Sequence, residues 1–206
     1  MSQKTLTVIA GVAAIMIAGC GSTSPTANSS PASSASASAA ASPSAQPSAV
    51  ATTTDPCQLV TPSEASSLTG VTYSAGTQET SGVCVYGSQT LNVFEVAFAQ
   101  AASPADANAQ WSQYEAKAQS TLTQAAQQIP GLTVNISVSD ISVAGFDRAA
   151  TGTFSATYQG HTFSASALYT LKGADFFAMS DLTASQPPPT AAALEAQAQT
   201  SSARLP

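Results

Sequence analysis

The chain has 206 residues, of which 44% are apolar and only 8% are charged, and its formal net charge is -6. Alanine is the commonest apolar residue and no run of about 18 large apolar residues occurs, which excludes a polytopic membrane protein. The basic residues are few and scattered, so no cationic surface exists to neutralise phosphates, and we do not expect nucleic-acid binding. Beyond Lys4 they are Lys117, Arg148, Lys172 and Arg204.

Residues 1–19 have the order of a bacterial export signal: Lys4, an apolar stretch over 6–18, then small residues before Cys20. The last four residues, Ile17-Ala18-Gly19-Cys20, resemble the bacterial lipobox. That resemblance implies removal of residues 1–19 and attachment of acyl chains such as palmitate to Cys20. Two or three chains, at about 0.8 kcal/mol per buried methylene, anchor a protein stably. The alternative is an ordinary secretory signal in which Cys20 is incidental.

Residues 20–54 predict a disordered tether that follows the lipidated cysteine. From Gly21 to Thr54 the stretch has no charge, and all but four of its residues are Ser, Thr, Ala or Pro. It therefore has no large side chains whose burial could offset the entropy of ordering. Such a composition suits either a bare spacer or a segment that carries O-linked sugars.

Composition changes at Asp55, and residues 55–206 are the size of one domain with a substantial core. This domain contains two cysteines, Cys57 and Cys84. An even pair in an exported, oxidising compartment predicts a disulfide. A redox or metal-binding pair is the alternative, but the spacing is not C-x-x-C and the chain has one histidine.

The first half of the domain predicts two helices and two strands. Thr61-Pro62-Ser63-Glu64 is a capping box, so we expect a helix over 62–69 that ends at Gly70. Strands are expected over 82–86 and 91–99, and in the second the alternation predicts one core face. A long helix is expected from Ser103 to about Gln128. Its apolar stripe comprises Trp111, Tyr114, Ala118, Leu122, Ala125 and Ile129. We expect Trp111 to be core, with a pocket-lining role as the alternative.

The second half predicts four strands and a final helix. The strands are expected over 133–142, 149–158, 162–171 and 175–182, and the helix over about 188–203. Short glycine-containing turns join the last three strands, which favours an antiparallel meander. In the strand over 162–171, an apolar set alternates with a small polar set. The whole order indicates an α+β domain, an antiparallel β-sheet flanked by helices.

No motif for catalysis, for a cofactor or for a metal is found. His161 follows a Gln159-Gly160 turn, has no nucleophile motif beside it and is expected to be a solvated turn residue. Asp140 and Asp147 flank a turn, whereas Asp175 and Asp181 are six residues apart on one predicted strand face. That spacing is about 20 Å, too far for paired acid–base work. We therefore expect no catalytic residue, no metal site and no cofactor.

Small side chains are abundant on the predicted sheet. They permit close packing of helix on sheet, or they leave a groove for an apolar ligand. Close packing is the simpler of the two interpretations.

Two segments resemble a known group of proteins. Asp55-Pro56-Cys57-Gln58-Leu59-Val60-Thr61 and Cys84-Val85-Tyr86, behind a lipobox and a tether, are similar to lipoproteins of unknown function from actinobacteria, especially mycobacteria. The resemblance implies a Cys57–Cys84 disulfide, a helix-flanked antiparallel sheet and no established activity. Lipoproteins with a Mog1/PsbP-like sandwich are similar only in architecture.

These observations predict a lipid-anchored protein on the outer face of the cell membrane. Its domain is expected to bind rather than catalyse, with an envelope protein or a cell-wall component as its partner. The alternative is a carrier or sensor of an envelope lipid or another small apolar ligand. A purely structural envelope component is the third interpretation.

Overall fold

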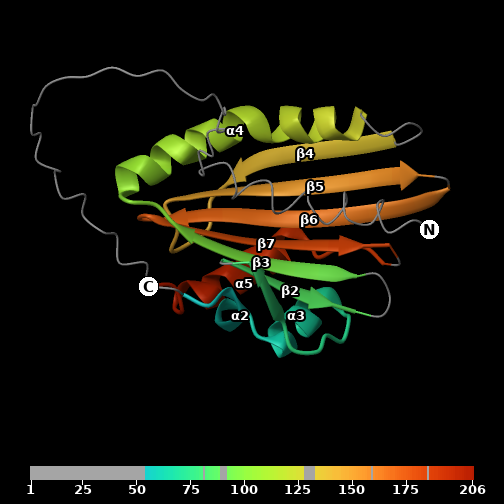
Figure 1. Cartoon of the computed structure of the whole chain (residues 1–206), viewed down its shortest axis with the longest axis horizontal. Helices are drawn as coiled ribbons and strands as arrows, with labels where there is room; N and C mark the ends of the chain where they lie inside the picture. The colour runs from blue at the N-terminus through green and yellow to red at the C-terminus, as the bar shows by residue number, and fades with distance from the viewer. Residues whose placement is uncertain (1–53, 81, 89–91, 128–132, 159, 185) are drawn as a thin grey trace, which may run out of the picture.

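The computed structural model describes residues 54–80, 82–88, 92–127, 133–158, 160–184 and 186–206 (Figure 1). The predicted export signal, Cys20 and all but the last residue of the tether lie outside the described residues.

A single seven-stranded sheet forms the centre of the domain, and every neighbouring pair in it is antiparallel. Its spatial order is β1-β2-β3-β7-β6-β5-β4. The strands are β1 (Thr77–Thr80), β2 (Val83–Gly87), β3 (Val93–Gln100), β4 (Thr133–Ile141), β5 (Arg148–Tyr158), β6 (His161–Lys172) and β7 (Asp175–Thr183). Hairpins build the two halves of the sheet, and the pairing of β3 with β7 joins them.

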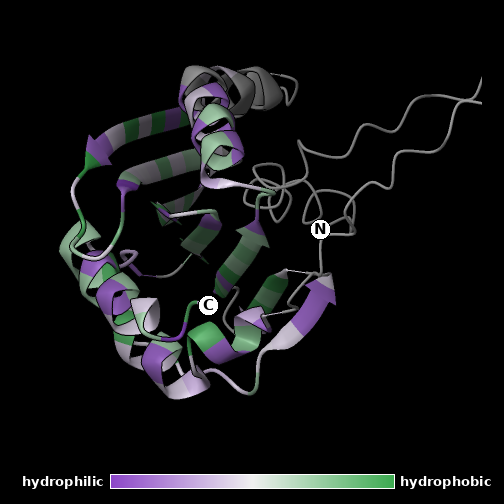
Figure 2. Ribbon diagram, turned by 90° about the vertical axis from the view of Figure 1, so that its left-hand side faces the viewer, coloured by the Kyte–Doolittle hydropathy of each residue, from purple (hydrophilic) through white to green (hydrophobic). Residues whose placement is uncertain are grey.

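Among the described residues, four helices cover parts of the two faces. They are α2 (Pro56–Leu59), α3 (Pro62–Thr69), α4 (Pro104–Gln127) and α5 (Ala191–Ser202). Figure 2 shows the curved sheet in side view, with α4 on one side and the three short helices on the other. We call the face covered by α2, α3 and α5 face A, and the face on which α4 packs face B. The α+β fold expected from the sequence is confirmed.

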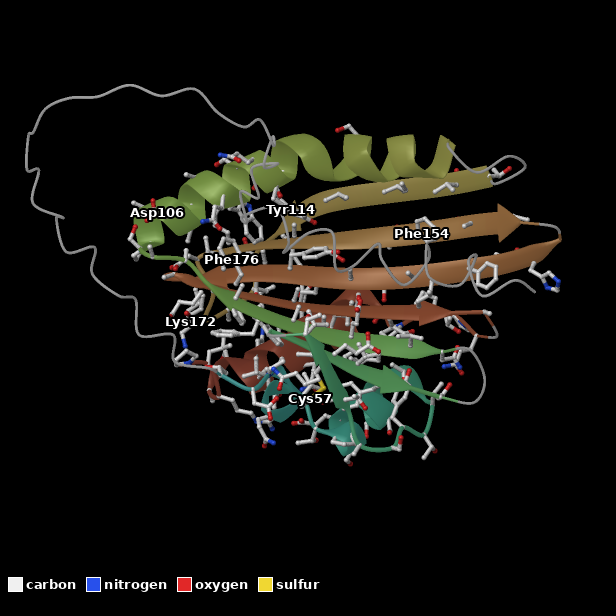
Figure 3. All side chains as sticks on the ribbon, viewed as in Figure 1. Cys57, Asp106, Tyr114, Phe154, Lys172 and Phe176 are labelled. Atoms are coloured by element: carbon white, nitrogen blue, oxygen red, sulfur yellow. A yellow bond between two sulfur atoms is a disulfide. The ribbon has the colours of Figure 1, made fainter. Side chains whose placement is uncertain are left out.

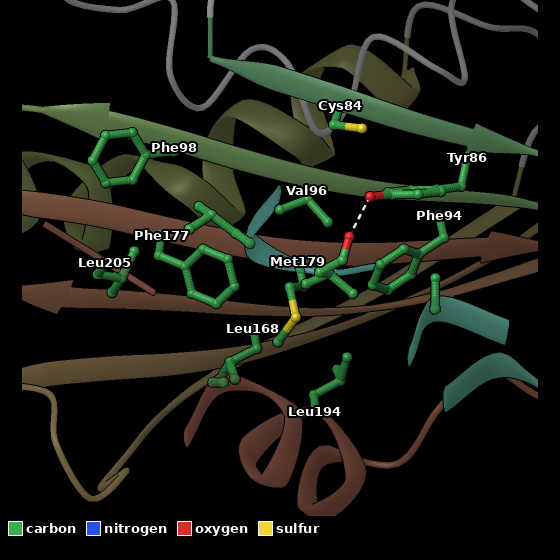
Figure 4. Packing of buried hydrophobic residues seen from close by; sticks show 14 of the residues in the cluster. Cys84, Tyr86, Phe94, Val96, Phe98, Leu168, Phe177, Met179, Leu194 and Leu205 are labelled. Carbon is green, nitrogen blue, oxygen red and sulfur yellow. Dashed lines mark hydrogen bonds between the residues drawn. The ribbon is translucent and has the colours of Figure 1, made fainter. Parts of the chain in front are cut away.

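The main core lies on face A, where large side chains of the central strands meet the short helices (Figure 4). Strand β3 shows the alternation clearly, because Phe94, Val96 and Phe98 are buried and the odd-numbered residues between them are half-buried. The face predicted for the core of β3 is therefore confirmed. The largest fully buried side chains here are Tyr86, Phe94, Phe177, Leu59, Leu168, Met179 and Leu194.

The Cys57–Cys84 disulfide ties α2 to β2, with a Cα–Cα distance of 5.2 Å. The Tyr86 hydroxyl, two residues beyond Cys84, donates to the main-chain carbonyl of Val60 (Figure 4). The disulfide predicted from the sequence is confirmed. A buried hydrogen bond adds a second link between β2 and the residue that follows α2.

The end of the domain is fastened to its beginning. Ser201 Oγ and Arg204 Nη1 both donate to the Leu59 carbonyl oxygen, at 2.8 and 2.9 Å. Arg204 also forms an ion pair with Glu64 at 2.5 Å, and this pairing lowers the Glu64 pKa to about 2. Leu205 is buried in the main core. The last helix and its tail therefore stabilise the first two helices.

The sequence predicted most elements but missed two. Helix α3 has the predicted bounds and the capping box, and Gly70 ends it with a φ of 74°. Helix α5 begins at Ala191 rather than at 188, because Thr190 caps it and the prolines before it cannot continue a helix. Helix α2 and strand β1 were not predicted. The expected meander of the last three strands is confirmed.

Candidate functional site

Face B carries a floor of small side chains across the centre of the sheet. In the register of the strands, one row runs Val85, Glu95, Ser180, Ala167 and Gly152, and the row beside it runs Val83, Ala97, Ala178, Tyr169 and Ala150. Apart from the buried Ala150, these residues are half-buried. Most of these side chains are small, so they project only a short distance from the backbone of the sheet. This set of residues is the central floor of face B.

Helix α4 borders this floor on one side only. It packs along β4, at one edge of the sheet (Figures 1 and 2). Its anchor is Trp111, which is 2% exposed and packs with Ala107, Ala150 and Leu171 in a second, smaller core. The prediction of Trp111 as core is confirmed.

Polar side chains also contact the Trp111 indole. Trp111 Nε1 donates to the Glu115 carboxylate, and Arg148 from β5 pairs with Glu115 at 3.0 Å. The Arg148 guanidinium also lies 5.7 Å from the centre of the Trp111 ring, a cation–π geometry. Helix α4 is therefore held in one position relative to face B.

Two tyrosines pack against each other where the helix meets the floor. Tyr114 from α4 and Tyr169 from β6 have ring centroids 5.1 Å apart (Figure 3 labels Tyr114). The Tyr114 hydroxyl oxygen is buried and has no hydrogen-bond partner among the described residues. Burial raises the pKa of Tyr169 to about 12, and the negative charge of Glu95 adds to this shift. Both phenols are therefore neutral hydrogen-bonding groups at physiological pH.

Glu95 is the charged residue of the central floor. Its closest polar contact is with Ser180, whose Oγ lies 3.5 Å from Oε2. Burial raises the pKa of Glu95 to about 7, and Glu79 on β1 adds to the shift. A carboxyl in this state either donates a hydrogen bond or accepts one near neutral pH. The floor thus combines an apolar surface with one adaptable polar group.

Glu95→Gln is expected to stabilise the protein at alkaline pH. The raised pKa means that the folded state loses stability as pH rises from about 4.5 to about 7, and glutamine cannot ionise. We expect a gain of about 1–2 kcal/mol at pH 8, discounted for partial exposure, and little change at pH 4. Urea unfolding at both pH values measures it. Equal stability of variant and parent at pH 8 would contradict the burial argument.

The residues considered from the sequence do not form a cluster. His161 is exposed, but it begins β6 rather than lying in the turn. Asp175 and Asp181 are both buried on face A at opposite ends of β7. Asp147 accepts a hydrogen bond from the Gly173 main-chain nitrogen, and Asp140 is exposed on β4. Each has a separate environment.

Within the described part of the chain, no group of three or more His, Cys, Asp or Glu residues has the arrangement of a metal site. No helix among the described residues is long and apolar enough to cross a membrane.

Comparison with known families now places the chain. Residues 15–160 match DUF3558, a family of proteins of unknown function. The chain belongs to the DUF3558 family. The match covers more than half of the chain, including the disulfide and most of the sheet. The match confirms that the chain belongs to a family of unknown function, as the two cysteine segments suggested.

Other comparisons add little to the DUF3558 assignment. No curated protein matches the chain. Among solved structures, a protein of unknown function from Pseudomonas aeruginosa, PA94, is similar with 16% identity and a TM-score of 0.35. The alignment covers 63% of this chain and 85% of that one. A similarity at this level carries no argument about function.

Glu95 was not selected from the sequence of this DUF3558 protein. The alternation of β3 placed it on the face opposite the core, where a charged residue suggests ordinary solvent exposure. A signal was present, because Glu95 is a single charge among Val, Phe and Ala. What the sequence does not contain is the position of α4, which leaves the central floor half-buried.

Proposed function

We propose that this DUF3558 protein is a lipid-anchored binding protein on the extracytoplasmic face of the cell membrane. In this proposal Cys20 carries the lipid, residues 20–54 form the tether, and the domain from residue 55 binds without catalysis. The partner is an envelope protein or a cell-wall component. The lipobox-like segment supports the anchor, and the half-buried central floor of face B supports the binding role.

The central floor is the observation that carries the binding proposal. Face A is covered by three helices over its large apolar side chains, whereas α4 borders face B along β4. Val83 and Val85 at the β2 side and Leu182 on β7 remain half-buried. A half-covered apolar surface of this kind is typical of an interaction site.

The anchor is tested by Cys20→Ala. Loss of the acylated sulfur should move the protein from the membrane fraction to the soluble fraction, because in this proposal the acyl chains on Cys20 hold it at the membrane. Fractionation of intact cells, followed by mass spectrometry of the N-terminal peptide, measures both location and lipid. Tight membrane retention of the variant would contradict the proposal.

The binding face is tested by photo-crosslinking in intact cells. A photoreactive residue at Val85, on the β2 side of the floor, should capture an envelope protein or a cell-wall fragment. The matched control is Ser139, which is exposed on the opposite face of β4. Equal capture at the two positions, or none at Val85, would overturn the assignment to face B.

A second function, a carrier of an envelope lipid or small apolar ligand, is favoured by one specific observation. The central floor combines small apolar side chains with the polar groups of Glu95 and Ser180 and the tyrosine hydroxyls. An apolar ligand chain could lie on the small side chains while its polar head bonds to these polar groups. Lipid adducts at Val85 would support this second function. Native mass spectrometry that gives identical masses before and after delipidation, with no binding of a fluorescent lipid, would contradict it.

A further inference from the structure

A buried carboxyl lies on face A, away from the candidate site. Asp181 on β7 is 1% exposed, and its cross-strand neighbours are Ser166 on β6 and Phe94 on β3. Ser166 is 3% exposed. Asp181 Oδ2 and Ser166 Oγ, side chains that directly oppose one another, both have no hydrogen-bond partner among the described residues.

No described cation balances this carboxyl. Arg148 pairs with Glu115, Arg204 pairs with Glu64, and Lys172 Nζ donates to the Ser202 carbonyl oxygen. A buried carboxylate without a cation is unfavourable, so the neutral acid is favoured.

Asp181 accepts a hydrogen bond from Tyr73, which lies in the segment 70–76 between α3 and β1. The Tyr73 hydroxyl donates to Asp181 Oδ1 at 3.3 Å, and its ring packs at 6.3 Å from Tyr86 and 6.4 Å from Phe94. Its main-chain nitrogen donates to Ser66 Oγ. Tyr73 therefore connects the buried carboxyl to the position of the segment 70–76.

The titratable groups around Asp181 are few. Tyr73 faces it from the segment 70–76, while Ser166 and Phe94 on the flanking strands do not titrate. The helices over face A carry Glu64, which is paired with Arg204, and Glu195. Burial raises the pKa of Asp181 to about 6, and the hydrogen bond from Tyr73 opposes that rise.

We propose that the buried carboxyl of Asp181 is a proton-binding site that controls how tightly the segment 70–76 is held on face A through Tyr73. With the proton bound, the neutral acid stays buried and accepts a hydrogen bond from the Tyr73 hydroxyl. With the proton lost, the buried charge favours opening of the segment, which gives the carboxylate access to water.

The proton would thereby act on the border of the candidate site. The segment 70–76 leads directly into β1, where Thr77 pairs with Val85 of the central floor. A methyl group at Gly76 would lie 2.5 Å from Cys84 Sγ, so this part of the segment is closely packed against β2. Opening would therefore loosen the β1 edge of the sheet. This inference does not depend on which partner face B binds.

Hydrogen exchange of the full chain tests the proposal. If opening restores the ordinary pKa of 3.8 to Asp181, protection of residues 70–76, corrected for intrinsic rates, should fall about tenfold from pH 5 to pH 8. Asp181→Asn should abolish this dependence, because the amide does not ionise and can accept from Tyr73 at every pH. Protection that is the same at both pH values in the parent would overturn the proposal.

Two further variants separate this site from other causes. Asp140→Asn, which changes an exposed carboxyl on β4 at the far edge of the sheet from β1, should leave the pH dependence of residues 70–76 unchanged. Tyr73→Phe removes a bond that lowers the Asp181 pKa, so its loss of protection should occur at higher pH. If Asp181→Asn does not fold, the carboxyl ¹³C titration of the parent decides: a midpoint near 6 supports the site, and one near 3.8 overturns it.

Discussion

Replacing both Cys57 and Cys84 by alanine is expected to lower the free energy of unfolding by about 3.6 kcal/mol. The disulfide closes a loop with a sequence separation of 27, and its removal restores the conformational entropy of that loop to the unfolded chain. Cys84 is fully buried against the core of face A, so alanine also removes a packed sulfur. Urea unfolding of the oxidised parent and the double variant measures the difference.

Dithiothreitol provides the control for this experiment. The reductant should lower the urea midpoint of the parent toward that of the double variant and leave the variant unchanged. If the parent and the variant unfold at the same urea concentration without reductant, the disulfide does not stabilise this fold as the loop argument requires.

Trp111→Ala is expected to cost about 3–4 kcal/mol of stability and to loosen α4 from face B. The indole is the largest member of the second core, and its loss leaves a cavity beside Leu171. It also removes the partner of the Glu115 carboxylate and the ring beneath Arg148. Urea unfolding gives the global cost, and hydrogen exchange of residues 104–115 reports the loss at α4.

Gln113→Ala is the matched control on the same helix. Gln113 is exposed, so its truncation should change stability by no more than about 0.5 kcal/mol. A comparable loss in both variants would mean that helix propensity, rather than the buried indole, determines how α4 is held.

The elements with strong local signals were predictable. Helix α3 has a capping box and a terminal glycine, and the last three strands have short turns and alternating side chains. Strand β1 has neither signal, because Thr77-Gln78-Glu79-Thr80 is polar throughout and all four residues are exposed. Helix α2 spans four residues, too few for a periodic pattern, although Asp55 caps it and Pro56 begins it.

The pairing of β3 with β7 could not be predicted from local pattern. It joins residues 75 to 89 positions apart, such as Glu95 and Ser180, and depends on how side chains of the two hairpins pack. The neighbourhood of Glu95 follows from this pairing. The candidate site was therefore hidden from the sequence even though its residues were visible in it.

Strand β6 shows why alternation predicts two faces without saying which one is covered. The set that contains Ser166, Leu168 and Thr170 is buried, while Ala165 and Ala167 of the apolar set are half-buried. The bulky Phe177 and Met179 on β7 bring the short helices to face A, and the hydroxyls of β6 are buried with them. Thr170 compensates by donating to the Phe177 carbonyl oxygen.

Residues 201–204 bond to Leu59 and Glu64, so the two ends of the domain are in direct contact. Proteolysis that removes residues 203–206 would delete Arg204, the ion-pair partner of the capping-box residue Glu64. Such cleavage would remove contacts with Leu59 and Glu64 at the start of the domain. Residues 201–204 therefore hold the first two helices in position on the domain, and their removal should lower its stability.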